Sequence, residues 1–422
     1  MPLKQHGRQY DLVVLGATGY TGQFVAEHVA THLPTNLKWA VAGRSEPKLQ
    51  EVIDECQKLN PDRLQPSIEI ADVNDDGQLH ALAKKTFVVI TTVGPYCMYG
   101  ERVFKACAES GTHYLDCTGE TPWVARMIRK YEKTAQDTGA IMFPQIGVES
   151  APPDLCTWTM ARFIRDKLDA PTGNVVVSLH KLSSAPSGGT LATLLGIFDH
   201  FSLEDLQASS KPYASSPIPH PEKARPSKGF LQRWLGICHV PNLGTLTTSI
   251  AGATDAPTIE RSWGLLSTIP SRKDQFYGPK FNWVEYYKPR NWLHGIFVHW
   301  GLILGMLILG FVPPVRALVK RFVYQPGQGT SREDLEREEV EYRGIASPDT
   351  ATPSGKQAYC RAWFHGSMYY LTAVFLAQGA LTVLEDDVGL DGGVYTPACL
   401  GQGLVDRANS AGFKMEVKML QN

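Results

Sequence analysis

The stretch Gly16-Ala17-Thr18-Gly19-Tyr20-Thr21-Gly22 decides how the first part of this chain folds. An apolar run at residues 12–15 precedes it and predicts a buried parallel strand, while residues 24–29 predict the start of a helix. Glycine is needed where such a turn is tight and where backbone approaches a pyrophosphate. The free N–H groups at a helix start can then hold phosphates. The G-x-x-G-x-x-G spacing therefore predicts a dinucleotide site, and an ordinary strand–helix turn is the alternative.

The cofactor is expected to contact six residues of this turn: Gly16, Thr18, Gly19, Tyr20, Thr21 and Gly22. The second predicted strand, residues 38–42, ends at Gly43, about twenty residues after the last glycine of the turn. An NAD enzyme usually carries an acid at this place, whereas this chain has Arg44 and Ser45. Arginine pairs with a phosphate through two hydrogen bonds, which favours NADP(H). The alternative is a surface arginine at a helix start.

The third and fourth predicted strands also end in residues suited to a ligand. Asp72 follows the third strand and could contact the adenine edge or cap the helix expected near residue 74. The fourth strand, residues 87–92, leads into a tight turn where nicotinamide would lie, so Gly94 and Pro95 join the predicted cofactor site. Tyr96 and Tyr99 are candidate catalytic acids or ring-stacking groups, with packing beneath a loop as the alternative.

The first ~150 residues alternate strand and helix, which is typical of a parallel sheet covered on both faces. A chain of 422 residues predicts two domains. The net charge of −1 gives no field that would attract nucleic acid, and the N-terminus has no apolar secretory segment. The eight cysteines show no C-x-x-C pair and no metal-ligand spacing, so we expect reduced core thiols and no metal site.

The second half is less periodic. Residues 174–180 predict a strand, residues 187–190 a glycine turn opening a helix, and residues 209–228 a long surface loop. The helix start at residues 187–190 could face cofactor or a substrate anion, or be a plain turn. Further strand-like runs suggest a mostly antiparallel sheet: Thr245–Ile250, Ile259–Ser267, Phe281–Tyr287, Glu339–Arg343 and Gln357–His365. A helix is expected over Tyr369–Glu385 and a final strand over Phe413–Leu420.

Several of these runs together resemble the saccharopine dehydrogenase-like oxidoreductases, which include the bacterial trans-acting enoyl reductases and their eukaryotic relatives. The similar segments are the glycine turn, Ala42-Gly43-Arg44, the run from Gly94 to Glu120, residues 147–155, residues 326–329 and residues 392–398. The family more often has aspartate where Glu149 stands and isoleucine where Ala151 stands. The resemblance implies a Rossmann domain (residues 1–155), an α+β domain with a mostly antiparallel sheet (residues 156–422), and NADP(H).

The resemblance also favours hydride transfer to a carbon–carbon double bond of a lipid-like or polyketide-like acyl group. Two alternatives stay open: a reductase of an amino-acid imine, and a membrane or lipid-droplet protein that holds NADPH without turnover. The chain has no Tyr-x-x-x-Lys pair, no G-x-S-x-G, no P-loop and no H-E-x-x-H. The proton donor that hydride chemistry requires is therefore not identified by any motif.

Residues 295–312 depart from the pattern of the rest of the chain. They contain no formally charged residue, and His299 is their only ionisable side chain. Their length barely meets the ~20 residues that span hydrocarbon. Aromatic residues precede the run and basic residues flank both ends, which suits a membrane interface. We expect a monotopic or hairpin attachment to a cytosol-facing membrane or a lipid droplet. A core or homodimer helix in a cytoplasmic protein is the alternative.

Overall fold

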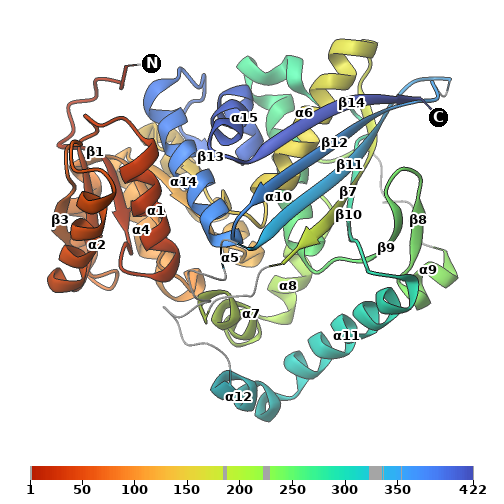
Figure 1. Cartoon of the computed structure of the whole chain (residues 1–422), viewed down its shortest axis with the longest axis horizontal. Coiled ribbons are helices and arrows are strands. Elements are labelled where there is room, and N and C mark those ends of the chain that lie inside the picture. Colours follow the sequence, from red (N-terminus) through yellow and green to blue (C-terminus); the bar gives the residue numbers. More distant parts are fainter. Residues whose placement is uncertain are drawn as a thin grey trace.

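The computed structural model describes residues 2–183, 188–221, 229–322, 335, 337–352 and 354–421. Its first sheet has seven strands in the order β13-β6-β5-β4-β1-β2-β3, and all of their described pairings are parallel (Figure 1). The strands are β1 (Tyr10–Leu15), β2 (Trp39–Gly43), β3 (Ser67–Ile70), β4 (Thr86–Thr91), β5 (His113–Asp116), β6 (Ile141–Phe143) and β13 (Gly393–Val394). Chain order reverses beside β1, which is where a doubly wound sheet binds its ligand.

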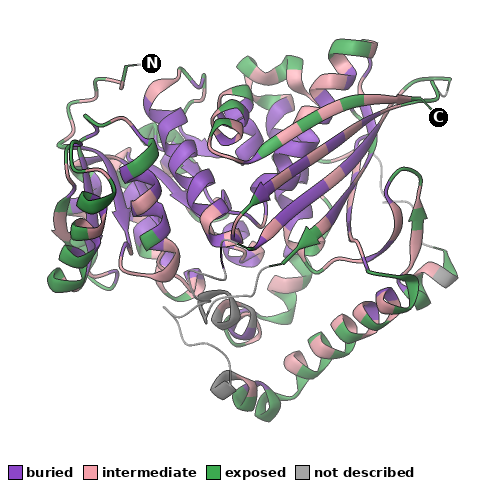
Figure 2. Ribbon diagram, in the orientation of Figure 1, coloured by how far each residue is buried: buried purple, intermediate pink, exposed green. Residues whose placement is uncertain are grey.

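Helices cover both faces of this sheet. Those from the first part of the chain are α1 (Tyr20–His32), α2 (Glu46–Leu59), α3 (Asp76–Lys84), α4 (Tyr96–Ser110) and α5 (Thr121–Thr138). The apolar helix α14 (Met368–Glu385) lies against α1, β4 and β5, and it is buried along most of its length (Figure 2). Nearly continuous apolar strands such as Leu12–Leu15 are buried because both faces of the sheet are covered.

The second sheet has the order β14-β12-β11-β7-β10-β9-β8. Its strands are β7 (Thr172–Leu182), β8 (Cys238–Val240), β9 (Gly244–Thr248), β10 (Asn282–Tyr287), β11 (Glu339–Pro348), β12 (Lys356–His365) and β14 (Lys414–Gln421). The β7–β10 pair is parallel, and the other described pairs are antiparallel. The expected fold class, a parallel Rossmann-type sheet followed by an α+β part with a mostly antiparallel sheet, is confirmed.

The remaining helices connect or flank the two sheets. They are α6 (Ala151–Leu168), α7 (Gly188–His200), α8 (Leu203–Ser209), α9 (Phe230–Leu235), α10 (Ala251–Thr268), α11 (Trp292–Phe311), α12 (Pro313–Phe322), α15 (Gly401–Ser410) and the 3₁₀ turns η1 (Pro270–Gln275) and η2 (Pro397–Leu400). Helix α6 packs against β11 and β12, and α10 packs against β10 and α6. In Figure 1, α11 and α12 lie along the lower edge of the molecule, and α11 contacts β9 of the second sheet.

One expected strand is wrong. Residues Ile259–Ser267 lie inside helix α10, where every residue from Asp255 to Leu266 is buried. Because this helix is buried on all sides, polar residues such as Glu260 and Arg261 lie inside together with apolar ones, and the sequence shows no helical alternation of a polar and an apolar face. Part of the expected loop at 209–228 and the segment 326–329 lie outside the described residues.

The chain returns to its first sheet near its end. Strand β13 pairs with β6 through Gly393–Ile141 and Val394–Met142, and α14 fills the face beside α1. Residues 368–394 thus complete a sheet that the first part of the chain begins. The division into domains at residue 155 stays a prediction. In the structure, residues 368–394 lie with the first sheet although they follow that boundary in the chain.

Candidate functional site

The glycine turn between β1 and α1 is tight enough to require two of its glycines. Gly16 has φ +86°, a left-handed conformation that side chains disfavour. A side-chain carbon on Gly22 would lie 2.1 Å from the carbonyl oxygen of Gly16. At Gly19 the same carbon would lie 3.2 Å from that oxygen, so the fold itself constrains this position less. Gly19 is therefore the position where a role towards a ligand is separable from a role in the turn.

Helix α1 begins at an open N-terminus. Within the described residues, Gly19 provides no side-chain cap, and the first turn carries no acidic residue. The backbone N–H groups of Tyr20, Thr21 and Gly22 have no helical acceptor at this position. Such a start, with the helix dipole behind it, fits a pyrophosphate. The residues present therefore fit the predicted dinucleotide.

Arg44 and Ser45 lie where the adenosine ribose would be bound. Arg44 is exposed between β2 and α2, and Ser45 is the N-cap of α2 without a capping hydrogen bond from its side chain. In the part of the chain that the structure describes, no ion pair or hydrogen bond to the Arg44 guanidinium is present. Both side chains are free to contact a 2′-phosphate.

We expect Arg44→Ala to raise the NADPH dissociation constant at least ~10-fold, since a charge-assisted hydrogen bond contributes ~1.5–3 kcal/mol. NADH binding should change little, because NADH lacks the 2′-phosphate. Fluorescence titration with both cofactors measures this. Lys48→Ala is the matched control, because it removes an exposed cation from α2 and should leave both constants unchanged. Equal losses for NADPH and NADH in Arg44→Ala would contradict the assignment.

Asp72 does not cap the next helix. Its Oδ1 accepts hydrogen bonds from the backbone and side-chain nitrogens of Asn74, at 2.9 and 3.0 Å, which forms a local turn. The N-cap of α3 is Asp75, whose side chain accepts from the backbone of Gln78. Asp72 lies just beyond the carboxyl end of β3, and its contact with adenine stays a prediction.

The turn after β4 is tied to the end of β5. Gly94 and Pro95 lead into α4, and the backbone N–H groups of Tyr96 and Cys97 each donate to the Glu120 carboxylate at 2.7 Å. These bonds hold the turn over the carboxyl edge of the sheet, where nicotinamide is expected.

Tyr96 is buried, and its hydroxyl donates to the carbonyl of Thr91 at 3.0 Å and lies 3.4 Å from Cys117 Sγ. Burial, and then the nearby Cys117 and Asp116, raise its pKa well above the usual value. This geometry matches packing beneath the loop better than proton donation. Tyr99 is half-buried against the same apolar cluster. Catalytic roles for both tyrosines stay predictions.

A group of carboxyl side chains, which we call the acidic cluster, lies where the two sheets meet: Glu149, Asp255 and Glu285. Glu149 precedes α6 and lies against Gly119, where a side-chain carbon would be 2.1 Å from Glu149 Oε2. Asp255 is fully buried on α10, and its Oδ1 accepts from Ser150 Oγ at 3.2 Å. Glu285 is buried on β10 and accepts from Ser249 Oγ at 2.7 Å. Sequence reasoning missed this cluster, because its members come from three separate elements.

The carboxyls of the acidic cluster retain protons more readily than ordinary ones. Burial, and then the neighbouring Glu120 charge, raise the pKa of Glu149 to about 7. Burial and the facing Glu285 carboxylate raise the pKa of Asp255, and burial raises that of Glu285. Within the described residues, no group of three or more His, Cys, Asp or Glu side chains is arranged to hold a metal ion.

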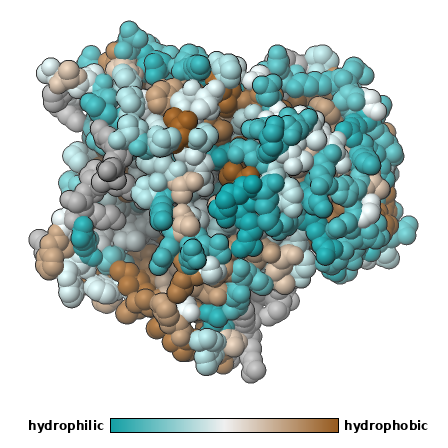
Figure 3. Space-filling model, turned by 180° about the vertical axis from the view of Figure 1, so that it is seen from behind, coloured by the Kyte–Doolittle hydropathy of each residue, from teal (hydrophilic) through white to brown (hydrophobic). Residues whose placement is uncertain are grey.

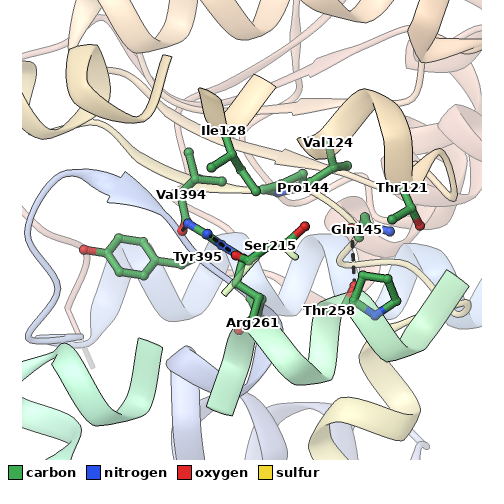
Figure 4. Close-up of a pocket in the computed structure, with 12 residues that line it drawn as sticks. Thr121, Val124, Ile128, Pro144, Gln145, Ser215, Thr258, Arg261, Val394 and Tyr395 are labelled. Atoms are coloured by element: carbon green, nitrogen blue, oxygen red, sulfur yellow. Dashed lines mark hydrogen bonds between the residues drawn. The ribbon is translucent and has the colours of Figure 1, made fainter. Parts of the chain in front are cut away.

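A narrow crevice beside the acidic cluster is lined by Gln145, Thr258 and Arg261 among others (Figure 4). Thr258 Oγ1 lies 3.3 Å from Gln145 Oε1, and Arg261 is 4% exposed. The Arg261 guanidinium donates to the carbonyls of Ser215 and Val394, at 2.7 and 2.6 Å, and pairs with Glu132. Arg261 therefore joins the two parts of the chain through its two terminal nitrogens, and its Nε has no hydrogen-bond partner among the described residues.

Comparison with known proteins places this geometry in context. The sequence profile "Saccharopine dehydrogenase NADP binding domain" matches residues 12–143. The trans-acting enoyl reductase of Mycobacterium tuberculosis is 32% identical over 433 residues, covering 97% of both chains. A lipid droplet localized protein of Caenorhabditis elegans is 38% identical over 194 residues, 44% of each chain. The fold of apo saccharopine dehydrogenase (L-Glu forming) from Saccharomyces cerevisiae covers 97% of this chain and 100% of that one, with a TM-score of 0.52 and 13% identity.

Proposed function

Because this chain belongs to the saccharopine dehydrogenase-like family of NADP-binding proteins, we propose that it is an NADP(H)-dependent enoyl reductase acting on a lipid-like or polyketide-like acyl group. The observation that carries the proposal is the full-length similarity to trans-acting enoyl reductases, at 32% identity over 97% of both chains. The glycine turn, the open start of α1 and the free Arg44 side chain support NADP(H).

The charges at the site favour this reaction over reduction of an amino-acid imine. A saccharopine-like substrate carries several carboxylates and needs several arginines. Glu120 and Glu149 instead place carboxyl groups at the loop that follows β5. The nearby Arg261 is already bound by Glu132 and two backbone carbonyls. A neutral acyl chain avoids the repulsion that an anionic substrate would meet here.

The direct test uses protein purified in mild detergent with NADPH and trans-2-hexadecenoyl-CoA. We expect loss of NADPH absorbance and formation of the saturated acyl product, measured by mass spectrometry. Reduction of NADP⁺ by saccharopine, with no reaction of the enoyl thioester, would replace the proposal by the imine alternative. Tight NADPH binding without turnover of either compound would point to a non-catalytic NADPH-binding protein.

We further propose that the protein attaches to a cytosol-facing membrane or to a lipid droplet. Two helices within the described residues are long and apolar enough to cross a membrane, but they differ in burial. The apolar window of α14 is 83% buried, as a core helix should be, whereas that of α11 is only 11% buried. Figure 2 shows α14 almost wholly buried and α11 as a mixture of exposed and intermediate residues.

Helix α11 contributes to a larger apolar surface, which we call the apolar platform. It consists of the exposed side chains of Phe230, Trp234, Leu235, Trp292, Leu293, Phe297, Leu304, Met306, Leu307, Ile308, Phe311, Val312, Val315 and Leu318. Trp234 and Trp300 contact one another, with ring centres 5.5 Å apart, and join α9 to α11. Apolar colour gathers over the lower part of the molecule in Figure 3. Exposed apolar patches of this kind mark interaction sites.

The contacts of α11 favour a helix that lies on the membrane surface over one that spans it. Thr247 Oγ1 donates to the carbonyl of Gly295 at 2.8 Å, and Thr248 Oγ1 lies 2.7 Å from His299 Nδ1. Near the other end, Phe198 of α7 lies 3.3 Å from the position of a side-chain carbon on Gly310. Both ends are thus held against the body, which leaves one face for lipid. The name of the C. elegans relative agrees with this location.

A further inference from the structure

The proposed reduction needs a proton as well as a hydride. When bound, NADPH would supply the hydride to the β-carbon of the enoyl group, and the α-carbon must then receive a proton. The two tyrosines near the β4 turn do not fit this task well, because Tyr96 is buried with its hydroxyl bonded to Thr91. A donor has to lie at the carboxyl edge of β4 and β5 with a polar atom open to the site.

Glu149 meets both conditions. Its carboxyl lies against Gly119, three residues beyond the end of β5, and a side chain at Gly119 would overlap it. The same loop carries Glu120, which holds the start of α4 and so the turn expected over nicotinamide. Glu149 is half-buried, and no hydrogen bond to its carboxyl is present in the described part of the chain. Its oxygens are therefore available to a bound molecule.

Two further buried carboxyls, those of Asp255 and Glu285, lie near Glu149. Asp255 and Glu285 are buried and face one another closely enough for their carboxyls to share a hydrogen bond. Asp255 Oδ2 and Glu285 Oε2 have no other partner among the described residues. Two buried carboxyls at this range cannot both be ionised at neutral pH, so the pair keeps a proton. Ser150, next to Glu149 in the chain, donates to Asp255.

We propose that Glu149 is the proton donor of this reductase and that it takes up its next proton from solvent. The inference rests on the proposed function. In the step, the hydride adds one hydrogen and two electrons to the β-carbon, and the electrons of the double bond move towards the thioester carbonyl. The O–H bond of Glu149 then breaks, its proton bonds to the α-carbon, and Glu149 is left as a carboxylate. The net change is addition of H⁻ and H⁺ to the substrate, with NADPH oxidised to NADP⁺.

The environment of Glu149 determines how its protonation responds to pH. The groups that interact with its charge are Glu120 beyond β5, Asp255 on α10, Cys117 just after β5 and Tyr342 on β11. Burial, and then the Glu120 carboxylate, favour the protonated form of Glu149. Activity should therefore fall as pH rises through the pKa of Glu149, about 7. Removing the neighbouring negative charge would lower the pKa of Glu149, so the loss of activity would then occur at lower pH.

The experiment compares Glu149→Gln and Glu149→Asp with the wild type. Glu149→Gln should bind NADPH with an unchanged dissociation constant and reduce trans-2-hexadecenoyl-CoA at least ~100-fold more slowly. Glu149→Asp should keep part of the rate. Glu51→Gln on the exposed face of α2 makes the same chemical change away from the site and should match the wild type. A normal rate and pH profile in Glu149→Gln would overturn the proposal.

A measurement without turnover separates this inference from the proposed function. Burial also raises the pKa of Asp154 and of Glu285 to about 7, so infrared titration of the carboxyl carbonyl stretch should show one fewer carboxyl ionising near pH 7 in Glu149→Gln than in the wild type. If the wild type reduces no enoyl thioester but this difference is present, the proposed function fails while a proton-holding Glu149 stands. If the titration is the same in both proteins, Glu149 holds no proton, and its role as donor is overturned.

Discussion

Gly19→Val should abolish NADPH binding while the protein stays folded. A side-chain carbon at this position would contact only the Gly16 carbonyl oxygen, at 3.2 Å, so the turn can accept it with a small shift. The branched side chain would then occupy the space above the open start of α1, where the pyrophosphate approaches. Calorimetric titration should show no binding at NADPH concentrations that saturate the wild type, which corresponds to a loss of at least ~100-fold in affinity.

Two further glycine variants make this result interpretable. Gly22→Val places a side-chain carbon 2.1 Å from the Gly16 carbonyl oxygen, so it should lower the melting temperature as well as abolish binding. Gly305→Val makes the same change in open space on α11 and should alter neither property. Normal NADPH binding to a folded Gly19→Val protein would mean that the dinucleotide binds elsewhere.

The first sheet could be predicted from the sequence because its signals are local. Short apolar strands and the glycine turn are each determined by neighbouring residues, and β1, β2 and β4 form where they were expected. Non-local contributions could not be seen in this way. Strand β13 pairs with β6 although about 250 residues separate them, and it has only two residues.

The candidate site likewise has one part that local sequence predicts and one part that only the packing of distant segments brings together. Its cofactor half follows the strand ends in order, so Gly19, Arg44 and Gly94 could be assigned from their spacing. The acidic cluster could not, because Glu149, Asp255 and Glu285 come from the α6 entrance, α10 and β10. Residue 149 belongs to a run that resembles the family, but the run itself gave no reason to assign it a chemical role. Only packing brings these carboxyls together and raises their pKa values.

For the apolar run at residues 295–312, the sequence predicted a helix but not what surrounds it. Its composition allowed either a core helix or a membrane-facing one, since both are apolar throughout. The structure distinguishes these readings by exposure: in α11 only Gly295 and His299 are buried. A core role for the segment is thereby disfavoured, and either lipid or another protein surface remains to cover the apolar platform.

Leu304→Asp combined with Leu307→Asp should release the protein from lipid. The two side chains are 50% and 48% exposed, so the substitutions disturb no core packing and the fold should survive. Each fully buried large apolar side chain contributes ~1.5–3 kcal/mol to membrane binding, so the apolar platform as a whole exceeds a single marginal anchor. Two aspartates cost a few kcal/mol in lipid, which corresponds to at least ~100-fold weaker partitioning.

Flotation measures this with phosphatidylcholine vesicles and with phosphatidylcholine-coated triolein droplets, which distinguishes a bilayer from a droplet surface. The wild type should float, and the double variant should stay in the soluble fraction with normal NADPH binding. The matched control is Leu59→Asp with Leu64→Asp, which changes two leucines of similar exposure, 45% and 50%, on the first domain. That control should float like the wild type, because its substitutions lie outside the apolar platform.

The oligomeric state decides between lipid and a second copy of the chain. If lipid covers the apolar platform, the detergent-free wild type should aggregate or bind added vesicles, and the double variant should be a well-behaved single species in light scattering. A wild type that forms a discrete dimer without detergent, ignores vesicles, and becomes monomeric on the two substitutions would identify α11 as a dimer helix. The exposed leucines of α11 would then serve protein association, and membrane attachment would be wrong.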